Sequence, residues 1–161
     1  MSNDHLKVPK KLTRVSLWVH PEGRVIGSIY TREQSTDHAG KEDPCEALNL
    51  DEKFLVLKRE DPDEIRFYNK SSIIRLEYED VNGSSPQIEN PLHCRLHMMD
   101  GAAINGEIKE SLPPDQNRLY DYLNRSDERF IKVHINKDTI YLVNKNYINQ
   151  ATEHDRATTS E

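Results

Sequence analysis

The residues best suited to chemistry lie close together in the second half of the chain: His93, Cys94 and His97, with His134 further on. Imidazole nitrogen and thiolate sulfur bind zinc at about 2.0–2.3 Å. If residues 92–98 form a strand, His93 and His97 share a face but stand about 13 Å apart at ~3.3 Å per residue, and Cys94 lies on the other face. One ion cannot reach all three, so we expect surface histidines beside a buried cysteine, with no metal and no other cofactor.

Signatures of catalysis are missing from the sequence. It contains no GxSxG, P-loop, GxGxxG or HExxH pattern. Ser71 and Ser72 have no histidine and carboxylate at a characteristic spacing, and the acidic pair Glu77 and Glu79 suits an edge strand that must stay soluble. We therefore predict that the protein is not an enzyme.

The dipeptide Asn-Lys occurs twice directly after a run of β-forming residues: Asn69-Lys70 in FYNKSSII and Asn144-Lys145 in YLVNKNYI. Such a loop could contact a partner. Asparagine also tolerates the left-handed conformation and caps its own turn, and lysine keeps a tight turn soluble. Because the pair recurs in surroundings of different charge, the structural interpretation is favoured, and the four residues stay a secondary candidate site.

Aromatic side chains could stack on single-stranded nucleic acid or anchor a protein partner. Trp18 lies, by alternation, opposite the face of Leu17 and Val19, and we expect a partner or the other half of the chain to cover it. Tyr120 lies opposite the apolar face of a predicted helix. Trp18 and then Tyr120 are the predicted interface residues.

Composition limits the class of partner. The chain of 161 residues has a net charge of −6, which argues against a partner held mainly through phosphates. Residues 11–80 hold 11 Lys and Arg against 15 Asp and Glu, whereas residues 91–150 hold 8 against 8, so an anionic partner would favour the second half. Hydrophobic residues make up 35% and charged residues 31%, which suits small units with little core.

Cysteine use and hydropathy indicate the compartment. Cys45 and Cys94 are the only cysteines and do not form a CxxC pair. No apolar stretch approaches the roughly 18 residues needed to cross a bilayer, and no apolar segment follows the first charges. We predict free thiols, a cytoplasmic location and no membrane contact.

The first and second halves of the chain have similar sequences. Aligning Gly27 with Gly106 preserves every apolar position at a period of two on either side. Further matches follow in order: Leu48-Asn49 with Leu123-Asn124, Phe54 with Phe130, Ile65 with Ile140, Phe67 with Leu142, Asn69-Lys70 with Asn144-Lys145, and Ile73 with Ile148. This pattern predicts a duplication.

Each copy is predicted to contain two strands, a helix, two strands, a short turn and a last strand. The Asp-Gly pair in the second copy, between alternating apolar runs, is a strong hairpin signal. Asp115 is a candidate N-cap for a helix that ends at Asn124. Five short strands make too small a sheet to stay flat, and closure into a barrel would remove the exposed edges.

The predicted fold class is therefore mainly β with short helices (α+β), as two tandem small five-stranded barrels, each with a helix inserted between strands 2 and 3. The predicted organisation is a disordered tail, a first barrel, a linker, a second barrel and a disordered tail, with the bounds 1–10, 11–80, 81–91, 92–152 and 153–161.

The segments LHMMDGAAINGEIKE and TIYLVNKNYI are similar to the first and second signatures of the Sm-like or SH3-like small barrels. Uncharacterised bacterial proteins that carry such a domain in tandem resemble this chain too. The sequence departs from the Sm pattern in two ways. Its predicted helix lies between strands instead of before them, and Asn144-Lys145 is not the Arg-Gly or Lys-His of the RNA-binding members, so their nucleotide pocket does not carry over.

Together these observations favour a non-catalytic adaptor or regulatory protein-interaction module, with a protein partner or self-association. Its copies would present a composite surface or an edge for strand addition. The alternative is an Sm-like protein that binds single-stranded RNA.

Overall fold

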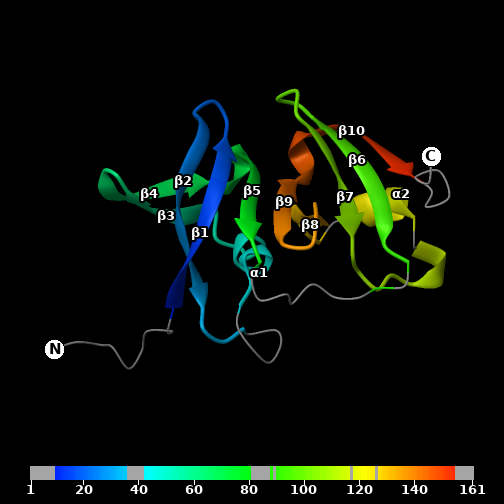
Figure 1. Cartoon of the computed structure of the whole chain (residues 1–161), viewed down its shortest axis with the longest axis horizontal. Helices are drawn as coiled ribbons and strands as arrows, with labels where there is room; N and C mark the ends of the chain where they lie inside the picture. The colour runs from blue at the N-terminus through cyan, green and yellow to red at the C-terminus, as the bar shows by residue number, and fades with distance from the viewer. Residues whose placement is uncertain are drawn as a thin grey trace. The chain divides into compact units, whose positions relative to one another are not determined.

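The computed structural model describes residues 10–35, 42–80, 88, 90–116, 118–125 and 127–154, and most of its regular structure is β-strand (Figure 1). Most of the predicted tails and linker lies outside the described residues. Of the tails only Lys10, Glu153 and His154 are described, and each lies in a strand. Contacts divide the chain into unit 1, residues 1–73, and unit 2, residues 74–161.

The described residues of unit 1 form four strands, one α-helix and one 3₁₀-helix. They are β1 (Lys10–Val19), β2 (Gly23–Arg32), α1 (Pro44–Leu48), β3 (Phe54–Glu60), β4 (Asp63–Asn69) and η2 (Lys70–Ser72). Strand β5 (Ile73–Glu79) starts at the division and lies almost wholly in unit 2.

The rest of unit 2 follows β5. Its elements are β6 (Leu92–Met98), β7 (Ala103–Ile108), η3 (Pro114–Gln116), α2 (Leu119–Leu123), β8 (Phe130–His134), β9 (Thr139–Asn144), η4 (Lys145–Tyr147) and β10 (Ile148–His154).

The strands form an open antiparallel sheet arrangement, so the prediction of two closed five-stranded barrels with inserted helices was wrong. Unit 1 has the order β1-β2-β3-β4 and unit 2 the order β10-β6-β7-β8-β9-β5, and the ten strands end at β10 and β4. Both helices are only five residues long. The mainly β content agrees with the expectation.

The prediction of closed barrels failed because β5 pairs with β9 and does not close the sheet of the first copy. The prediction assumed that each small sheet must close on itself to cover its edges. Instead β5 covers the edge of β9, with five antiparallel residue pairs from Arg75↔Val143 to Glu79↔Thr139. Ile74, Leu76 and Tyr78 of β5 are buried, and so is Arg75 between them. This strand is therefore suited to an interior place in a sheet.

Strands form where apolar residues alternate, and each unit buries the inward residues. In unit 1 these include Val15, Leu17, Val25, Ile29, Leu48, Leu55 and Leu57, and in unit 2 Leu96, Ile104, Ile108, Tyr122, Phe130, Ile131, Val133 and Leu142.

Two glycines allow the second strand of each hairpin to approach the next strand closely. A Cβ atom on Gly27 of β2 would lie 2.7 Å from the backbone oxygen of Lys58 in β3. A Cβ atom on Gly106 of β7 would lie 2.8 Å from the backbone oxygen of His134 in β8. Because a backbone oxygen cannot move aside as a flexible side chain can, neither site has room for a side chain.

We predict that Gly27→Ala and Gly106→Ala each destabilise the protein by about 1–3 kcal/mol, because the new methyl group overlaps the neighbouring backbone. Asn105→Ala is the control, since Asn105 is an exposed residue of β7 beside Gly106, and it should change the free energy of unfolding by less than about 0.5 kcal/mol. Urea unfolding followed by circular dichroism measures all three. Equal stability of Gly106→Ala and Asn105→Ala would contradict the close approach.

Candidate functional site

The apolar face of unit 1 is the most distinctive surface in the described chain. It consists of five large hydrophobic side chains with exposed fractions between 45% and 69%: Leu12, Ile26, Phe54, Ile65 and Phe67. Only two other large hydrophobic side chains of the described residues are exposed, Met99 and Tyr120. Isolated exposed apolar residues are ordinary, but a group on one sheet face marks an interaction site.

Strand register places the five residues on the same side of the sheet. Ser28 pairs with Lys58, and Lys58 pairs with Ile65, so these three residues lie in one row across β2, β3 and β4. Directly paired residues and residues an even number of positions apart share a face. Counting in steps of two along each strand from this row reaches Ile26, Phe54 and Phe67. On β1 the row continues at Arg14, which pairs with Ser28, and Leu12 is two positions away.

The opposite side of this sheet is the packed core of unit 1. Leu17, Ile29 and Leu57 are fully buried there. The five exposed residues therefore do not belong to the core of unit 1, which is already packed on the other side of the sheet.

Strand β4 is the end strand of unit 1. It pairs with β3 over seven residue pairs from Phe54↔Asn69 to Glu60↔Asp63, and Figure 1 shows the two strands as neighbouring arrows. In the strand order of the described residues, no strand follows on its other side. An edge strand with unpaired backbone groups is a template for another strand, and charged side chains, above all lysine, and proline are usual protections. Strand β4 has the charged residues Asp63, Glu64 and Arg66 but no lysine or proline.

The charge on β4 is compensated on the side away from the apolar face. Arg66 contacts Glu64 through Nε at 2.6 Å and Glu22 through Nη1 at 3.2 Å, and Nη1 also donates to the Tyr68 hydroxyl at 3.1 Å. The hydrogen bond with Tyr68 and then that with Glu64 raise the pKa of Arg66 above its ordinary value. Arg66 is thus a fixed positive charge at the centre of the edge strand.

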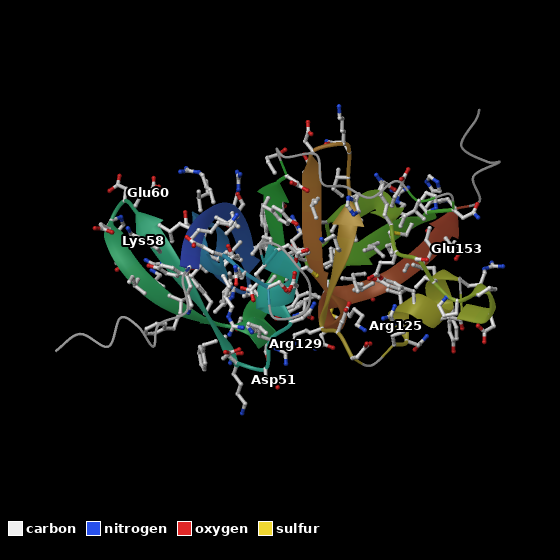
Figure 2. All side chains as sticks on the ribbon, turned by 90° about the horizontal axis from the view of Figure 1, so that it is seen from below. Asp51, Lys58, Glu60, Arg125, Arg129 and Glu153 are labelled. Atoms are coloured by element: carbon white, nitrogen blue, oxygen red, sulfur yellow. The ribbon has the colours of Figure 1, made fainter. Side chains whose placement is uncertain are left out.

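Charged residues lie on the same face, among the apolar ones. Lys58 pairs directly with Ile65, and Arg14 on β1 pairs with Ser28 in the same row. Lys58 and Glu60 project from β3 (Figure 2), and the Glu60 carboxylate lies 3.4 Å from Nη1 of Arg14. Both partners of this ion pair are well exposed, so the pair adds little stability. The face therefore presents apolar side chains and charges side by side.

The predicted interface residues lie apart from one another. Trp18 is half-buried on β1, opposite Arg24, on the same side of the sheet as the apolar face. Tyr120 is 77% exposed on α2 in unit 2. The residues of β3 and β4 that form the centre of the apolar face were not among the predicted site residues.

The two Asn-Lys pairs are turn caps with the same geometry in both units. The Asn69 side chain accepts a hydrogen bond from the Ser71 amide at 2.9 Å, and the Asn144 side chain accepts one from the Asn146 amide at 2.9 Å. Both asparagines have extended backbone angles, so neither uses the left-handed conformation that the sequence suggested.

The lysines of these pairs turn inward. Lys70 is 3% exposed, and its Nζ donates to the backbone oxygen of Leu50 at 3.0 Å. Nζ of Lys145 donates to the backbone oxygen of Arg125, and burial lowers the pKa of this lysine. Each lysine holds the loop between the helix and the next strand, α1 to β3 or α2 to β8, against the turn. The sequence instead suggested that the lysines keep the turn soluble.

Four chemically active residues form a row across unit 2. The register pairs His154 with His93, His93 with Glu107, and Glu107 with His134. Nδ1 of His93 lies 3.5 Å from Oε1 of Glu107. Together with Lys109, Lys137 and other residues, the row lines a cavity of about 440 Å³. His97 is outside this cavity lining.

Burial controls the chemistry of this region. His134 is 4% exposed, and burial, followed by the nearby Lys109 and Lys132, lowers its pKa to about 4. Cys94 is 2% exposed, and burial raises its pKa to about 12, so its thiol stays protonated at neutral pH. Within the described residues, no group of three or more His, Cys, Asp or Glu side chains is arranged to hold a metal ion.

Comparison with protein-family models, curated proteins and solved structures found no match to this chain. The resemblance to Sm-like and SH3-like barrels therefore stays a prediction. In the part of the chain that the structure describes, no helix has the length and apolar character to cross a membrane.

We predict that Lys70→Met destabilises the protein by about 1–3 kcal/mol, because the part-buried Leu50 carbonyl loses its donor. Lys145→Met should act in the same direction through the Arg125 carbonyl. Lys137→Met, at an exposed lysine, is the matched control and should change the free energy of unfolding by less than about 0.5 kcal/mol. Urea unfolding measures the three variants, and equal midpoints for Lys70→Met and Lys137→Met would show that the inward lysine is dispensable.

His134 predicts a loss of stability in mild acid. Its pKa is about 4 in the folded protein and about 6.5 when unfolded, so the unfolded state binds more protons between these values. The contribution is fully present above pH ~6.5 and is lost as the pH falls towards 4, with an upper limit of about 3 kcal/mol.

The pH profile of the free energy of unfolding tests this, with His134→Gln compared with the wild type. Carboxylates titrate in the same range, so the relevant quantity is the difference between the two profiles. Asn105→Gln on β7 removes no titratable group, so it is the control and should keep the wild-type slope. Parallel profiles for His134→Gln and the wild type would contradict a neutral buried imidazole.

Proposed function

We propose that this protein is a non-catalytic, cytoplasmic protein-interaction module, an adaptor or regulator, built from two copies of one β-rich unit. Unit 1 binds a protein partner through its apolar face. The observation that carries the proposal is the gathering of Leu12, Ile26, Phe54, Ile65 and Phe67 on one face beside the open edge strand β4.

The duplication is supported by local geometry that recurs at the aligned positions. Gly27 and Gly106 meet the next strand in the same way. The main-chain amides of the two turn lysines, Lys70 and Lys145, each donate at 2.9 Å to a carbonyl of the preceding loop, and their side chains each reach a carbonyl there. Unrelated strands have no reason to share so many specific contacts.

The size and nature of the side chains favour a protein partner. Burial of a phenylalanine or isoleucine side chain is worth about 1.5–3 kcal/mol, so Phe54, Ile65 and Phe67 together could supply a stable interface centre. The net charge of −6 and the charged residues on the same face, among them the Arg14–Glu60 ion pair, suit a partner that carries polar as well as apolar side chains.

Single-stranded RNA is the second candidate, because the cavity of unit 2 brings Lys109, Lys137 and three histidines together. This class follows from the predicted Sm-like resemblance. Fluorescence anisotropy with labelled single-stranded RNA separates the two candidates. Electrostatic binding is strongest at low salt, so an RNA signal there that disappears in Lys109→Glu would favour this candidate.

We expect Phe67→Asp and Ile65→Asp to abolish capture of a partner from a cytosolic extract of the source organism, because each places a charge in the interface centre. Folding should persist, since the two side chains are 69% and 54% exposed. Affinity purification with quantitative mass spectrometry compares the proteins that each bait retains.

Met99→Asp and Tyr120→Asp are the matched controls, because they add the same charge at exposed apolar residues of unit 2. A partner retained by both controls and lost by Phe67→Asp supports the apolar face. A partner lost only by Tyr120→Asp would move the interface to α2, and a partner retained by every variant would refute the proposed site.

A further inference from the structure

The pairing of β5 with β9 shows which kind of strand covers such an edge. In unit 2, Leu76 pairs with Leu142 and Tyr78 pairs with Ile140, so bulky apolar residues meet on one face. Glu77 lies between them and faces the other side, opposite Tyr141.

Strand β9 occupies the same structural place as β4. Phe54 pairs with Asn69 where β3 meets β4, and Phe130 pairs with Asn144 where β8 meets β9. Each of these asparagines caps the 3₁₀-helix that follows its strand. Counting back from the caps makes Phe67 equivalent to Leu142, Arg66 to Tyr141 and Ile65 to Ile140.

The two equivalent strands differ in how far they are covered. Leu142 is 0% exposed and Ile140 is 2% exposed, whereas Phe67 is 69% and Ile65 is 54% exposed. The edge of β9 has β5 as a partner strand, and the edge of β4 has none among the described strands. The apolar residues of β4 thus match a position that the same chain covers with a strand elsewhere.

The strand of this chain that could extend β4 in a second molecule is β10, because it occupies the place of β5. Ile73 and Ile148 end equivalent 3₁₀-helices with nearly identical backbone angles, so Ala151 replaces Leu76 and Glu153 replaces Tyr78. A small residue and a carboxylate would oppose Phe67 and Ile65.

The Glu153 carboxylate is also engaged within its own unit. Glu153, labelled in Figure 2, lies 3.0 Å from Nε of Arg118 and accepts a hydrogen bond from the Leu119 amide at the start of α2. Pairing β10 with β4 of a second copy would place this charge beside Ile65, so another copy is a poor occupant of the edge.

We infer that β4 binds an extended segment of a different protein as an added antiparallel strand, in the register that β5 uses on β9. The segment carries bulky apolar residues opposite Phe67 and Ile65 and an acidic residue between them opposite Arg66. This rests on the proposed function and specifies its partner. The sequence of β5 meets the requirement, with Leu76, Glu77 and Tyr78 at the three positions.

A labelled synthetic peptide with the β5 sequence SIIRLEYED, residues 72–80, tests this on the full-length protein by fluorescence anisotropy. We expect saturable binding to the wild type that weakens about tenfold or more with Phe67→Ser, since the phenyl group leaves the contact. Met99→Ser is the control and should bind normally. Peptide binding that Phe67→Ser does not weaken relative to Met99→Ser would mean that the peptide binds elsewhere, for example by replacing β5 on β9. That result would overturn the proposal.

Changes in the peptide test its pattern without disturbing the protein. Replacing its leucine and tyrosine by serine, or its central glutamate by lysine opposite Arg66, should each weaken binding. A peptide with the β10 sequence INQATEH should not bind. Binding of the β10 peptide as tight as that of the β5 peptide would contradict the assigned register.

Backbone methylation tests strand addition itself. Alternate amides of a strand face the same neighbour, so N-methyl groups on one alternating set of peptide amides should abolish binding and those on the other set should not. Equal tolerance of both sets would show docking on the apolar face without strand pairing. In that case Phe67-dependent capture of a cellular partner would still support the proposed function. If neither strand pairing nor Phe67-dependent capture is observed, both the strand-addition inference and the proposed function are refuted.

Self-association is the remaining outcome. Sedimentation velocity of the protein alone should give a monomer for the wild type and for Phe67→Ser. A wild-type dimer that Phe67→Ser dissociates would identify a second copy as the occupant and overturn the assignment to a different protein.

Discussion

Backbone groups at the end of a sheet need hydrogen-bond partners, and this constraint organises the whole structure. β9 meets it by pairing with β5, in which five consecutive or alternating positions, Ile73, Ile74, Arg75, Leu76 and Tyr78, are buried. β10 meets it by exposing polar residues to water, as its sequence INQATEH shows. β4 follows neither course, since Ile65 and Phe67 remain exposed beside an open edge. β4 and β9 occupy equivalent places, and β10 occupies the place of β5. The comparison therefore separates an edge that the chain pairs, an end strand with polar residues and an end strand with exposed apolar residues.

The turn after β4 and the turn after β9 fix the register on which these differences depend. Each turn uses an asparagine to cap a 3₁₀-helix and a lysine to bond a carbonyl of the preceding loop. An ammonium group withdrawn from water is costly without partners, and each lysine limits this cost by donating to a part-buried backbone carbonyl. The cap determines where β4 and β9 end relative to β3 and β8. It therefore determines which side chains of β4 face outward.

Local features were predictable from the sequence, and pairing between distant segments was not. Alternation and the Asp-Gly turn located the strands, and the repeated Asn-Lys located the turns. Closure was predicted wrongly because the partner of β5 is a strand more than sixty residues away, and alternation along a strand carries no information about its neighbour. The histidine row was missed for the same reason, since His154, His93 and His134 meet only through register. Ile65 and Ile140 are the same residue type in similar segments, so their opposite burial could not be read from either segment alone.

The proposed duplication offers a way to separate structure from function. Features that recur in both units, such as Gly27 with Gly106 and the two capped turns, are assigned to the fold. Features found in one unit only are the candidates for binding a partner. Replacement of the β5 pattern Leu-x-Tyr by Ala-x-Glu in β10 removes the apolar contacts that would let chains add to one another end to end. Under the proposed function, the exposed apolar residues of β4 and the polar residues of β10 give the chain one binding edge and no complementary edge for end-to-end assembly. This asymmetry favours recognition of a different protein over indefinite self-assembly.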